Sequence, residues 1–258
     1  MSDPNFIFRI KTLTSVGSLR QCVEIQREIW SWSDEDLLPL RTLLLLRKIG
    51  GQVLGALDAS GKVMGFINAF PGYRDGKVYL HSQMLGVRKE FQGQGLGKQL
   101  KLAQREEAIH HGIQRIEWTF DPLETRNAQL NLERLGVICR RYVSDAYGPS
   151  TSSLHGTLPT DRLVAEWYIS SERVRSRINL NHVARLLPVK ATVVELPADI
   201  GQIKLQKQST AAVIQNNFKN QIILLLEKGY CVTAFSKSSD QSKVFYYLEP
   251  FNQKILDS

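Results

Sequence analysis

Residues 91–100 read FQGQGLGKQL, with three glycines inside five positions. Gly93, Gly95 and Gly97 carry no Cβ atom, so the backbone N–H groups beside them can approach an anion closely. Lys98 follows at the start of an amphipathic stretch, where a helix dipole would repel a lysine unless phosphate groups neutralised it. This stretch therefore predicts a phosphate-binding loop at a helix N-terminus.

The segments around the loop alternate between strand and helix patterns. An apolar strand is expected over 77–87 and a helix over 95–111, with Gly112 as its stop. A second strand is expected over 113–120, followed by a turn and helix over 121–136 and a further strand over 137–143. This order indicates an α/β or α+β sheet protein.

The flanking regions extend the same pattern. Upstream we expect a strand over 6–13, helices over 16–32 and up to Lys48, and a hairpin of 52–59 and 62–70 around Ser60-Gly61. Downstream we expect a strand over 161–169, a basic helix over 170–186, a strand over 189–195, a long helix over 199–228, and strands over 230–236 and 243–249. The composition changes near residue 170, which suggests two domains, 1–169 and 170–258.

Composition excludes several classes of protein. Of the 258 residues 43% are hydrophobic and 22% charged, as in ordinary soluble domains. No stretch is long enough to span a membrane, and the first residues lack the pattern of a secretory signal. Cys22, Cys139 and Cys231 are far apart and without metal-ligand spacing, so we expect buried thiols, no metal and a cytoplasmic protein. The net charge of +8 suggests an anionic partner, with nucleic acid as one alternative.

The glycine spacing distinguishes between the known phosphate motifs. The dinucleotide-binding pattern GxGxxG would need a glycine at 98, and the P-loop pattern would need a Ser or Thr at 99. The pattern [RQ]xxGx[GA] fits, with Gln92, Gly95 and Gly97. It resembles motif A of the GCN5-related N-acetyltransferases (GNAT superfamily), whose loop amides hold the coenzyme A pyrophosphate.

Three further stretches resemble a little-characterised bacterial branch of predicted acetyltransferases in that superfamily: LHSQMLGV (80–87), WTFDPLETRNAQLN (118–131) and LPTDRLVAEW (158–167). The superfamily resemblance covers about residues 6–169, and the branch resemblance covers nearly the whole chain.

The resemblance implies a GNAT fold, with a mixed, mostly antiparallel, V-splayed central sheet flanked by helices, and here a C-terminal strand–helix–hairpin extension. Acyl-CoA would lie where strand 77–87 splays from strand 113–120. The residues that the resemblance assigns to the cofactor are Leu85, Gly86, Val87, Gln92, Gly93, Gln94, Gly95, Leu96, Gly97, Lys98, Thr125 and Asn127.

Acyl transfer to an amine needs a proton acceptor for the amine and a proton for the leaving thiolate. His81 is the first candidate for the base, because arylalkylamine acetyltransferases of the superfamily carry a histidine there; their second histidine is replaced by Gln83. Glu117 is the alternative base. In the superfamily a tyrosine on a helix usually protonates the thiolate, and Leu132 stands at that position here. Tyr147 is therefore the candidate for the acid; the alternative is that the thiolate leaves unassisted.

Arg126 and Arg162 are candidates for binding an acceptor carboxylate, with solvated surface charge as the alternative. The sequence thus predicts an acyl-CoA-dependent N-acyltransferase, most simply an N-acetyltransferase, acting on a small amine such as an amino acid. A non-catalytic acyl-CoA-binding module and a nucleic-acid-binding protein are the alternatives. We expect no membrane partner, and a homodimer is left open.

Overall fold

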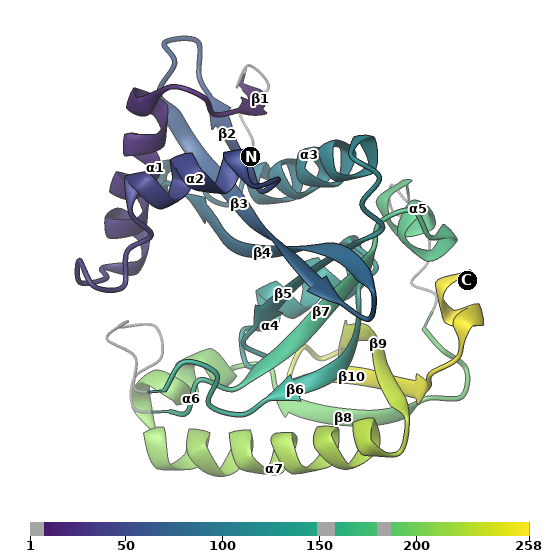
Figure 1. Cartoon of the computed structure of the whole chain (residues 1–258). Helices are drawn as coiled ribbons and strands as arrows, with labels where there is room; N and C mark the ends of the chain where they lie inside the picture. The colour runs from purple at the N-terminus through teal and green to yellow at the C-terminus, as the bar shows by residue number, and fades with distance from the viewer. Residues whose placement is uncertain (1–7, 149–157, 180–186, 258) are drawn as a thin grey trace. The chain divides into compact units, whose positions relative to one another are not determined.

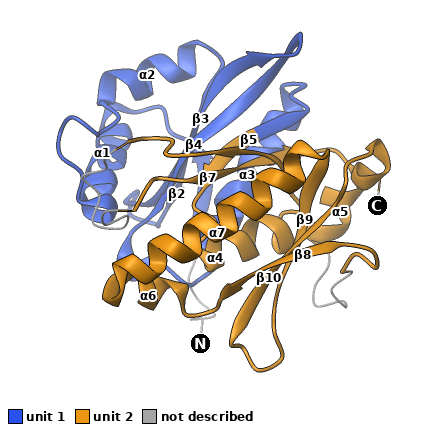
Figure 2. Cartoon of the chain, turned by 90° about the horizontal axis from the view of Figure 1, so that it is seen from below, with its two compact units in different colours: residues 1–116, 151–154 blue, residues 117–150, 155–258 orange. Residues whose placement is uncertain are grey.

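The computed structural model describes residues 8–148, 158–179 and 187–257 (Figure 1). They form two compact units, one ending at Ile116 and one beginning at Glu117 (Figure 2).

Some predictions fall outside these residues or across this division. Two predicted segments lie outside the described residues. They are the start of the first strand, at 6–7, and the end of the basic helix, at 180–186. The predicted domain boundary near residue 170 falls inside the second unit. It stays a prediction about where a catalytic domain ends.

The first unit is built on an antiparallel sheet in the order β1 (Arg9–Thr12), β2 (Gln52–Leu57), β3 (Val63–Arg74) and β4 (Lys77–Val87). The turn between β3 and β4 consists of Asp75 and Gly76, with φ values of 53° and 73°. Positive φ at both residues is the geometry that matches the twist of two paired strands. The predicted hairpin around Ser60-Gly61 is confirmed.

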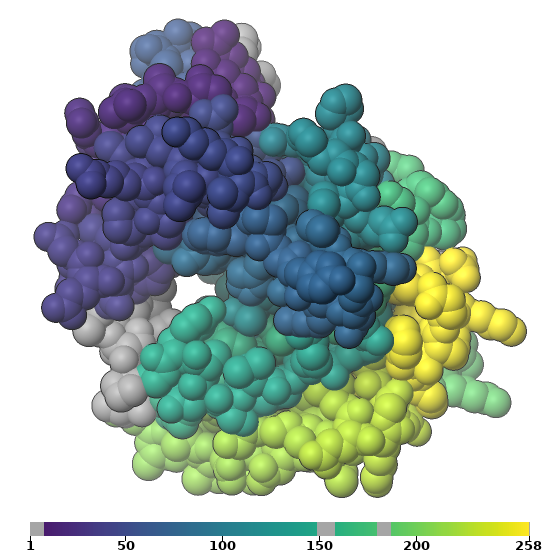
Figure 3. Space-filling model, viewed as in Figure 1, coloured from purple at the N-terminus to yellow at the C-terminus, as the bar shows by residue number. Residues whose placement is uncertain are grey.

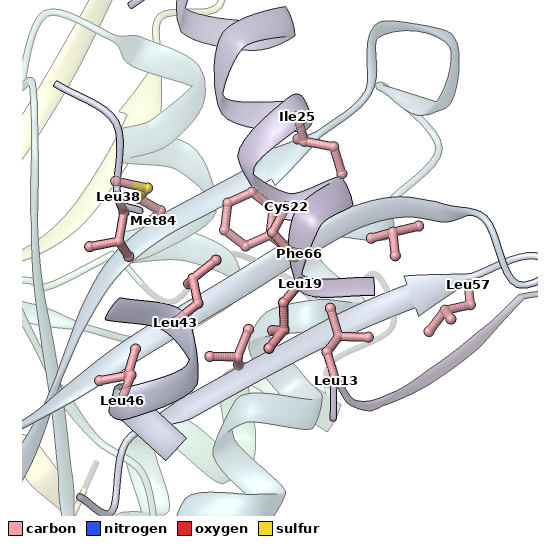
Figure 4. Packing of buried hydrophobic residues seen from close by; sticks show 12 residues of the cluster. Leu13, Leu19, Cys22, Ile25, Leu38, Leu43, Leu46, Leu57, Phe66 and Met84 are labelled. Atoms are coloured by element: carbon pink, nitrogen blue, oxygen red, sulfur yellow. The ribbon is translucent and has the colours of Figure 1, made fainter. Parts of the chain in front are cut away.

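Helices cover both faces of this sheet. Helices α1 (Val16–Trp30) and α2 (Leu40–Lys48) pack on one face, and α3 (Leu96–His110) packs on the other (Figure 1). The alternation of side chains along a strand explains the two cores, since Val53 belongs to the first cluster and its neighbour Leu54 to the second. Figure 4 shows the first cluster, in which Leu19, Cys22 and Ile25 of α1 meet the sheet.

The second unit contains a sheet in the order β5-β7-β6-β9-β10-β8. Its strands are β5 (Arg115–Phe120), β6 (Ile138–Val143), β7 (Arg162–Tyr168), β8 (Thr192–Pro197), β9 (Tyr230–Lys237) and β10 (Lys243–Pro250). Its helices are α4 (Thr125–Ala128), which continues as a π-helical turn over Gln129–Arg134, α5 (Glu172–Asn179), α6 (Ile200–Gln206) and α7 (Gln208–Glu227). Each unit thus contains mostly antiparallel strands flanked by helices, which agrees with the α/β or α+β sheet protein expected from the sequence.

The extension after residue 170 joins this second sheet. Strand β9 pairs antiparallel with β6, where Cys139 lies opposite Val232, and β10 and β8 continue the sheet beyond it. The predicted strand over 189–195 and the predicted strand pair over 230–236 and 243–249 are confirmed as elements. Helix α7 lies at the surface in Figure 3, while its Phe218 and Ile222 are buried.

The expectation of one helix over 199–228 was wrong. The helix is interrupted at Lys207, whose φ of −141° and ψ of 66° are outside the helical region. On the short first piece, Ile200 is buried and Lys204 bonds to Asp121 and Glu124, contacts remote in the sequence. The apolar pattern alone did not encode this break.

Candidate functional site

The glycine-rich loop connects β4 to α3 through a short 3-10 turn at Lys89–Phe91. Gly93 and Gly95 have φ values of 78° and 81°, a region that residues with a Cβ atom adopt with strain. A Cβ atom built at either position would meet nothing within 4 Å. The glycines are therefore needed for the backbone conformation, and the space in front of them is open.

The start of α3 is left without a side-chain cap. Gly95 occupies the N-cap position and supplies no side-chain hydrogen bond to the first amides of the helix. The side chains of Gln92 and Gln94 turn back instead, donating to the carbonyl oxygens of Val87 (2.8 Å) and Glu90 (3.1 Å). Lys98, half-exposed in the first turn, has no ion pair with any residue that the structure describes. Uncapped amides, a helix dipole and a lysine fit a phosphate group.

A β-bulge interrupts β4 just before the residues predicted to contact the cofactor chain. The register moves from Ala69 opposite Ser82 to Asn68 opposite Met84, so Gln83 is the extra residue. Buried Asn68 holds the bulge: its Oδ1 accepts from the Met84 backbone N–H, and its Nδ2 donates to Gln83 Oε1, both at 3.1 Å. Asn68 was not foreseen, although a lone amide inside the apolar run KVMGFINAF was the signal for it.

Leu85, Gly86 and Val87 complete the strand after the bulge. A Cβ atom on Gly86 would lie 3.0 Å from a methyl group of Ile29 and 3.3 Å from Ile25, so α1 packs directly over the backbone there. The side chains of Leu85 and Val87 face the opposite side and join the α3 core. This end of β4 is therefore held rigidly between two helices.

His81 lies on β4 opposite Phe70 of β3 and is half-buried. Its neighbour Ser82 faces α3, so alternation turns the His81 side chain toward the face covered by α1 and α2. Phe70 packs on that face together with Trp30 and Trp32, whose rings are stacked 4.7 Å apart. The candidate base thus has Phe70 as its cross-strand neighbour within its own unit.

Behind the bulge, α3 buries a lysine that the sequence analysis did not single out. Lys101 Nζ donates to Ser82 Oγ at 2.9 Å and to Gln104 Oε1 at 3.4 Å. Burial lowers the pKa of this ammonium group well below its usual range. Lys101, Gln104 and Ala108 recur at helical spacing on one face of α3, and this spacing could have predicted that the lysine is buried.

In the second unit the structure brings Tyr147 together with Arg162 and Thr119. The Tyr147 hydroxyl lies 2.9 Å from Thr119 Oγ1 on β5, and the Arg162 guanidinium stacks 5.3 Å from the ring centroid. The loop that carries Tyr147 is tied down by Thr160, whose Oγ1 accepts from the Tyr147 backbone N–H. The tyrosine is 62% exposed, so its hydroxyl group is accessible while its position is defined. Thr119 was missed because an isolated threonine in a strand carries no motif.

Glu117 has a different environment from that of a free base. It is 1% exposed, and its Oε2 accepts a hydrogen bond from Arg141 at 2.7 Å. Arg141 also donates a hydrogen bond to the Glu166 carboxylate. The same carboxylate accepts hydrogen bonds from Arg140 and from the Tyr168 hydroxyl. A basic partner therefore neutralises the carboxylate of Glu117, which makes Glu117 a weaker candidate for the base.

The residues at the start of α4 are exposed or half-exposed. Thr125, Arg126 and Asn127 begin this helix, and Arg126 makes no ion pair with the described residues. Two acids close to it in the sequence, Asp121 and Glu124, are both bonded by Lys204 of the extension, at 2.9 and 3.0 Å. Arg126 is thus left facing solvent.

The three cysteines are buried, as expected. Burial raises the pKa of Cys22 and of Cys231 to about 12, so these thiols stay protonated and unreactive. The described residues contain no group of three or more His, Cys, Asp or Glu side chains that could hold a metal ion. Within the same residues, every helix is too short or too polar to cross a membrane.

Comparisons with known proteins agree with the fold. The model of the "Acetyltransferase (GNAT) family" matches residues 19–136. The fold resembles that of a protein from Desulfovibrio desulfuricans described as a GNAT acetyltransferase (TM-score 0.50, 10% identity, 64% of this chain and 100% of that one).

Two other solved structures show the same fold. One is a protein of Acinetobacter baylyi described as an acetyltransferase (TM-score 0.51, 17% identity, 64% and 94% covered). The other is an aminoglycoside 6'-acetyltransferase of type Ii (TM-score 0.50, 18% identity, 62% of this chain and 97% of that one). Among curated proteins, none matches the sequence. At these identities the structures support the fold, and the family match supports the class of reaction.

Proposed function

Because residues 19–136 belong to the acetyltransferase (GNAT) family, we propose that this chain transfers an acyl group, most simply acetyl, from coenzyme A to a small amine. The chain is an acyltransferase of the GNAT type. An amino acid or a similar small amine as acceptor, and acetyl-CoA as donor, are the specific parts of the proposal.

The loop at the start of α3 is the observation that carries it. Gly93 and Gly95 have positive φ, and the space beside their backbone is open. The first amides of the helix have no side-chain cap. Residues 92–98 would hold the pyrophosphate, and the backbone of 85–87 would hold the pantetheine chain. Thr125 and Asn127 are the proposed cofactor contacts of the second unit. Bound acetyl-CoA supplies an acyl group that is activated as a thioester.

His81 is proposed to take the proton from the amine. A neutral imidazole can accept a proton near neutral pH, and the half-buried position of His81 opposite Phe70 limits its contact with water. Glu117 is the weaker candidate, because its carboxylate is already paired with Arg141. Gln83, bonded to Asn68, has a visible role in holding the bulge.

Tyr147 is proposed as the proton donor of the second unit. Its hydroxyl is held by Thr119, and Arg162 over its ring favours a defined orientation. Leu132, in the position of the usual tyrosine, is fully buried and offers no proton. Arg126, exposed and unpaired among the described residues, and Arg162 are the proposed contacts for an acceptor carboxylate.

The test combines calorimetric titration of the protein with acetyl-CoA and a thiol-release assay over a panel of amines that includes amino acids. Binding together with turnover of at least one amine supports the proposal. Binding without turnover would favour a non-catalytic acyl-CoA-binding module, the alternative that the buried Leu132 supports. Absence of binding would contradict the assignment of the loop.

A further inference from the structure

A pocket of about 380 Å³, open to solvent on one side, lies on the first unit at the end of the sheet where β2 and β4 begin. The C-terminal turns of α3 and α2 close its sides, through Ala108 and Ile49 among others. The phosphate loop is at the opposite end of α3. Since α3 has 15 residues, the rise along the helix separates the two by about 20 Å. The pocket is therefore distinct from the loop proposed to hold the cofactor.

The lining of the pocket combines opposite charges with an apolar surface. Arg47 of α2 and Glu107 of α3 both line it, and neither forms an ion pair with another residue of the described ranges. Glu107 Oε2 accepts a hydrogen bond from Thr12 at 3.2 Å, which orients the carboxylate. Leu80 and Ile113 contribute apolar surface. A cation, an anion and apolar side chains in one small pocket match a zwitterion that has an apolar tail.

His111 adds an acceptor to the same wall. Its Nδ1 lies 2.8 Å from the Glu107 carbonyl oxygen, which can only accept, so Nδ1 carries the proton. In the neutral ring Nε2 is then an acceptor. An ammonium group beside Glu107 would have both a carboxylate oxygen and an imidazole nitrogen as acceptors.

A buried amide with an unused polar atom is the second observation. Gln52 lines the pocket and is 3% exposed; its Nε2 donates to the Gln104 carbonyl oxygen, while its Oε1 has no partner among the described residues. Gln104 Nε2, also buried, has none there either. Both atoms are enclosed by protein, so the Gln52 amide is a buried part of the pocket wall and its signals can report on changes in the pocket.

From these observations we infer that the pocket is a second binding site, specific for a free amino acid with an apolar side chain. The ligand's ammonium group binds Glu107 and His111, its carboxylate binds Arg47, and its side chain lies against Leu80 and Ile113. The site does not depend on the acyl-transfer chemistry, because none of these residues belongs to the proposed cofactor or catalytic set.

The test is calorimetric titration with L-leucine in the absence of acetyl-CoA. Isoamylamine and 4-methylpentanoate, which each keep one charge of the zwitterion, are titrated in parallel. We expect L-leucine to bind and each half-molecule to bind about tenfold more weakly or worse. Glu107→Gln, which can keep the Thr12 hydrogen bond, and Arg47→Met, which keeps the apolar stem, should each weaken L-leucine binding about tenfold or more.

Matched controls are available on the same helices. Glu106→Gln and Lys48→Met remove exposed charges next to the pocket residues and should leave binding unchanged. Side-chain amide NMR signals of Gln52 should shift on titration. The proposal is overturned if millimolar L-leucine does not bind, if Glu107→Gln and Arg47→Met bind it like wild type, or if a half-molecule binds as well. His81→Ala should still bind L-leucine, so loss of acyl transfer and loss of this site are separable results.

Discussion

At the scale of single residues, Gly95 shows how a backbone requirement differs from a packing requirement. Its φ of 81° disfavours any branched side chain, whereas the space around its missing Cβ atom is open. Asn68, by contrast, is required for its hydrogen bonds to Met84 and Gln83. The glycine is visible in the sequence because its spacing is local, and the asparagine gains its meaning only from a neighbouring strand.

Gly95→Val should abolish binding of acetyl-CoA without unfolding the chain, because the side chain would enter the space proposed for the pyrophosphate. Calorimetric titration measures the loss, and circular dichroism checks the fold. Gly61→Val is the matched control, since Gly61 has a φ of 88° and equally open surroundings in a hairpin turn. The Gly61→Val variant should have the same backbone strain and should still bind acetyl-CoA. If Gly95→Val bound acetyl-CoA like wild type, the loop assignment would be wrong.

His81→Ala should lower the acyl-transfer rate at neutral pH by about 10²-fold, with the affinity for acetyl-CoA little changed. The wild-type rate should rise with pH through a single ionisation, that of a histidine or of the amine. His110→Ala, an exposed histidine on α3, is the control and should leave the rate unchanged. An unaltered rate in His81→Ala would assign proton removal to another group or to water.

At the scale of elements, the packing of α3 on the sheet buries one ammonium group, which is unfavourable for its charged form. Lys101 is 3% exposed, and Ser82 and Gln104 accept its hydrogen bonds. Burial lowers its pKa in the folded chain, while the unfolded chain keeps the ordinary lysine value of about 10.4. Between these two pKa values unfolding takes up a proton, so the free energy of unfolding increases with pH in that window.

Lys101→Met should remove this pH dependence. Urea unfolding of wild type and variant from pH 6 to 10 should show the wild type gaining stability relative to Lys101→Met as the pH rises. The slope is at most about 1.4 kcal/mol per pH unit inside the window. Lys48→Met, at an exposed position on α2, controls for the general loss of one positive charge. Parallel curves for wild type and Lys101→Met would contradict a lowered pKa.

At the scale of the whole molecule, the extension is part of a compact unit and not an appendage to it. Strand β9 pairs with β6, the Tyr246 hydroxyl donates to the Pro122 carbonyl oxygen, and Lys204 bonds to Asp121 and Glu124. Gln215 Nε2 donates to the Pro159 carbonyl oxygen close to Thr160, which ties the Tyr147 loop. Helices α6 and α7 thus support the segments that carry candidate site residues of the second unit.

Truncation after Ser170 should therefore give insoluble or molten protein. It would uncover the edge of β6 and the apolar side chains that α7 covers. Expression, near-UV circular dichroism and activity of the 1–170 fragment test this. In the full chain, Phe218→Ala should cost about 3–5 kcal/mol of stability, while Val213→Ala, on the exposed side of α7, should cost little. A soluble 1–170 fragment with undiminished activity would show that the extension is independent.

The sequence by itself determined the features that depend on neighbours along the chain. The glycine spacing at 93–97 predicted the loop and the helix start, and the Ser60-Gly61 turn predicted the hairpin of the first unit. Side-chain alternation and helical spacing separated buried from exposed faces. These signals are reliable because φ preferences and periodicity act over a few residues.

Only the tertiary structure decided the partners of the polar side chains. Asn68 meets Gln83, Lys101 meets Ser82, Thr119 meets Tyr147, and Lys204 meets Asp121 across 83 residues of sequence. The interruption of the long helix at Lys207 belongs here too. A buried polar group needs a hydrogen-bond partner, but any of several distant residues can supply it, so strand pairing and helix packing must form first.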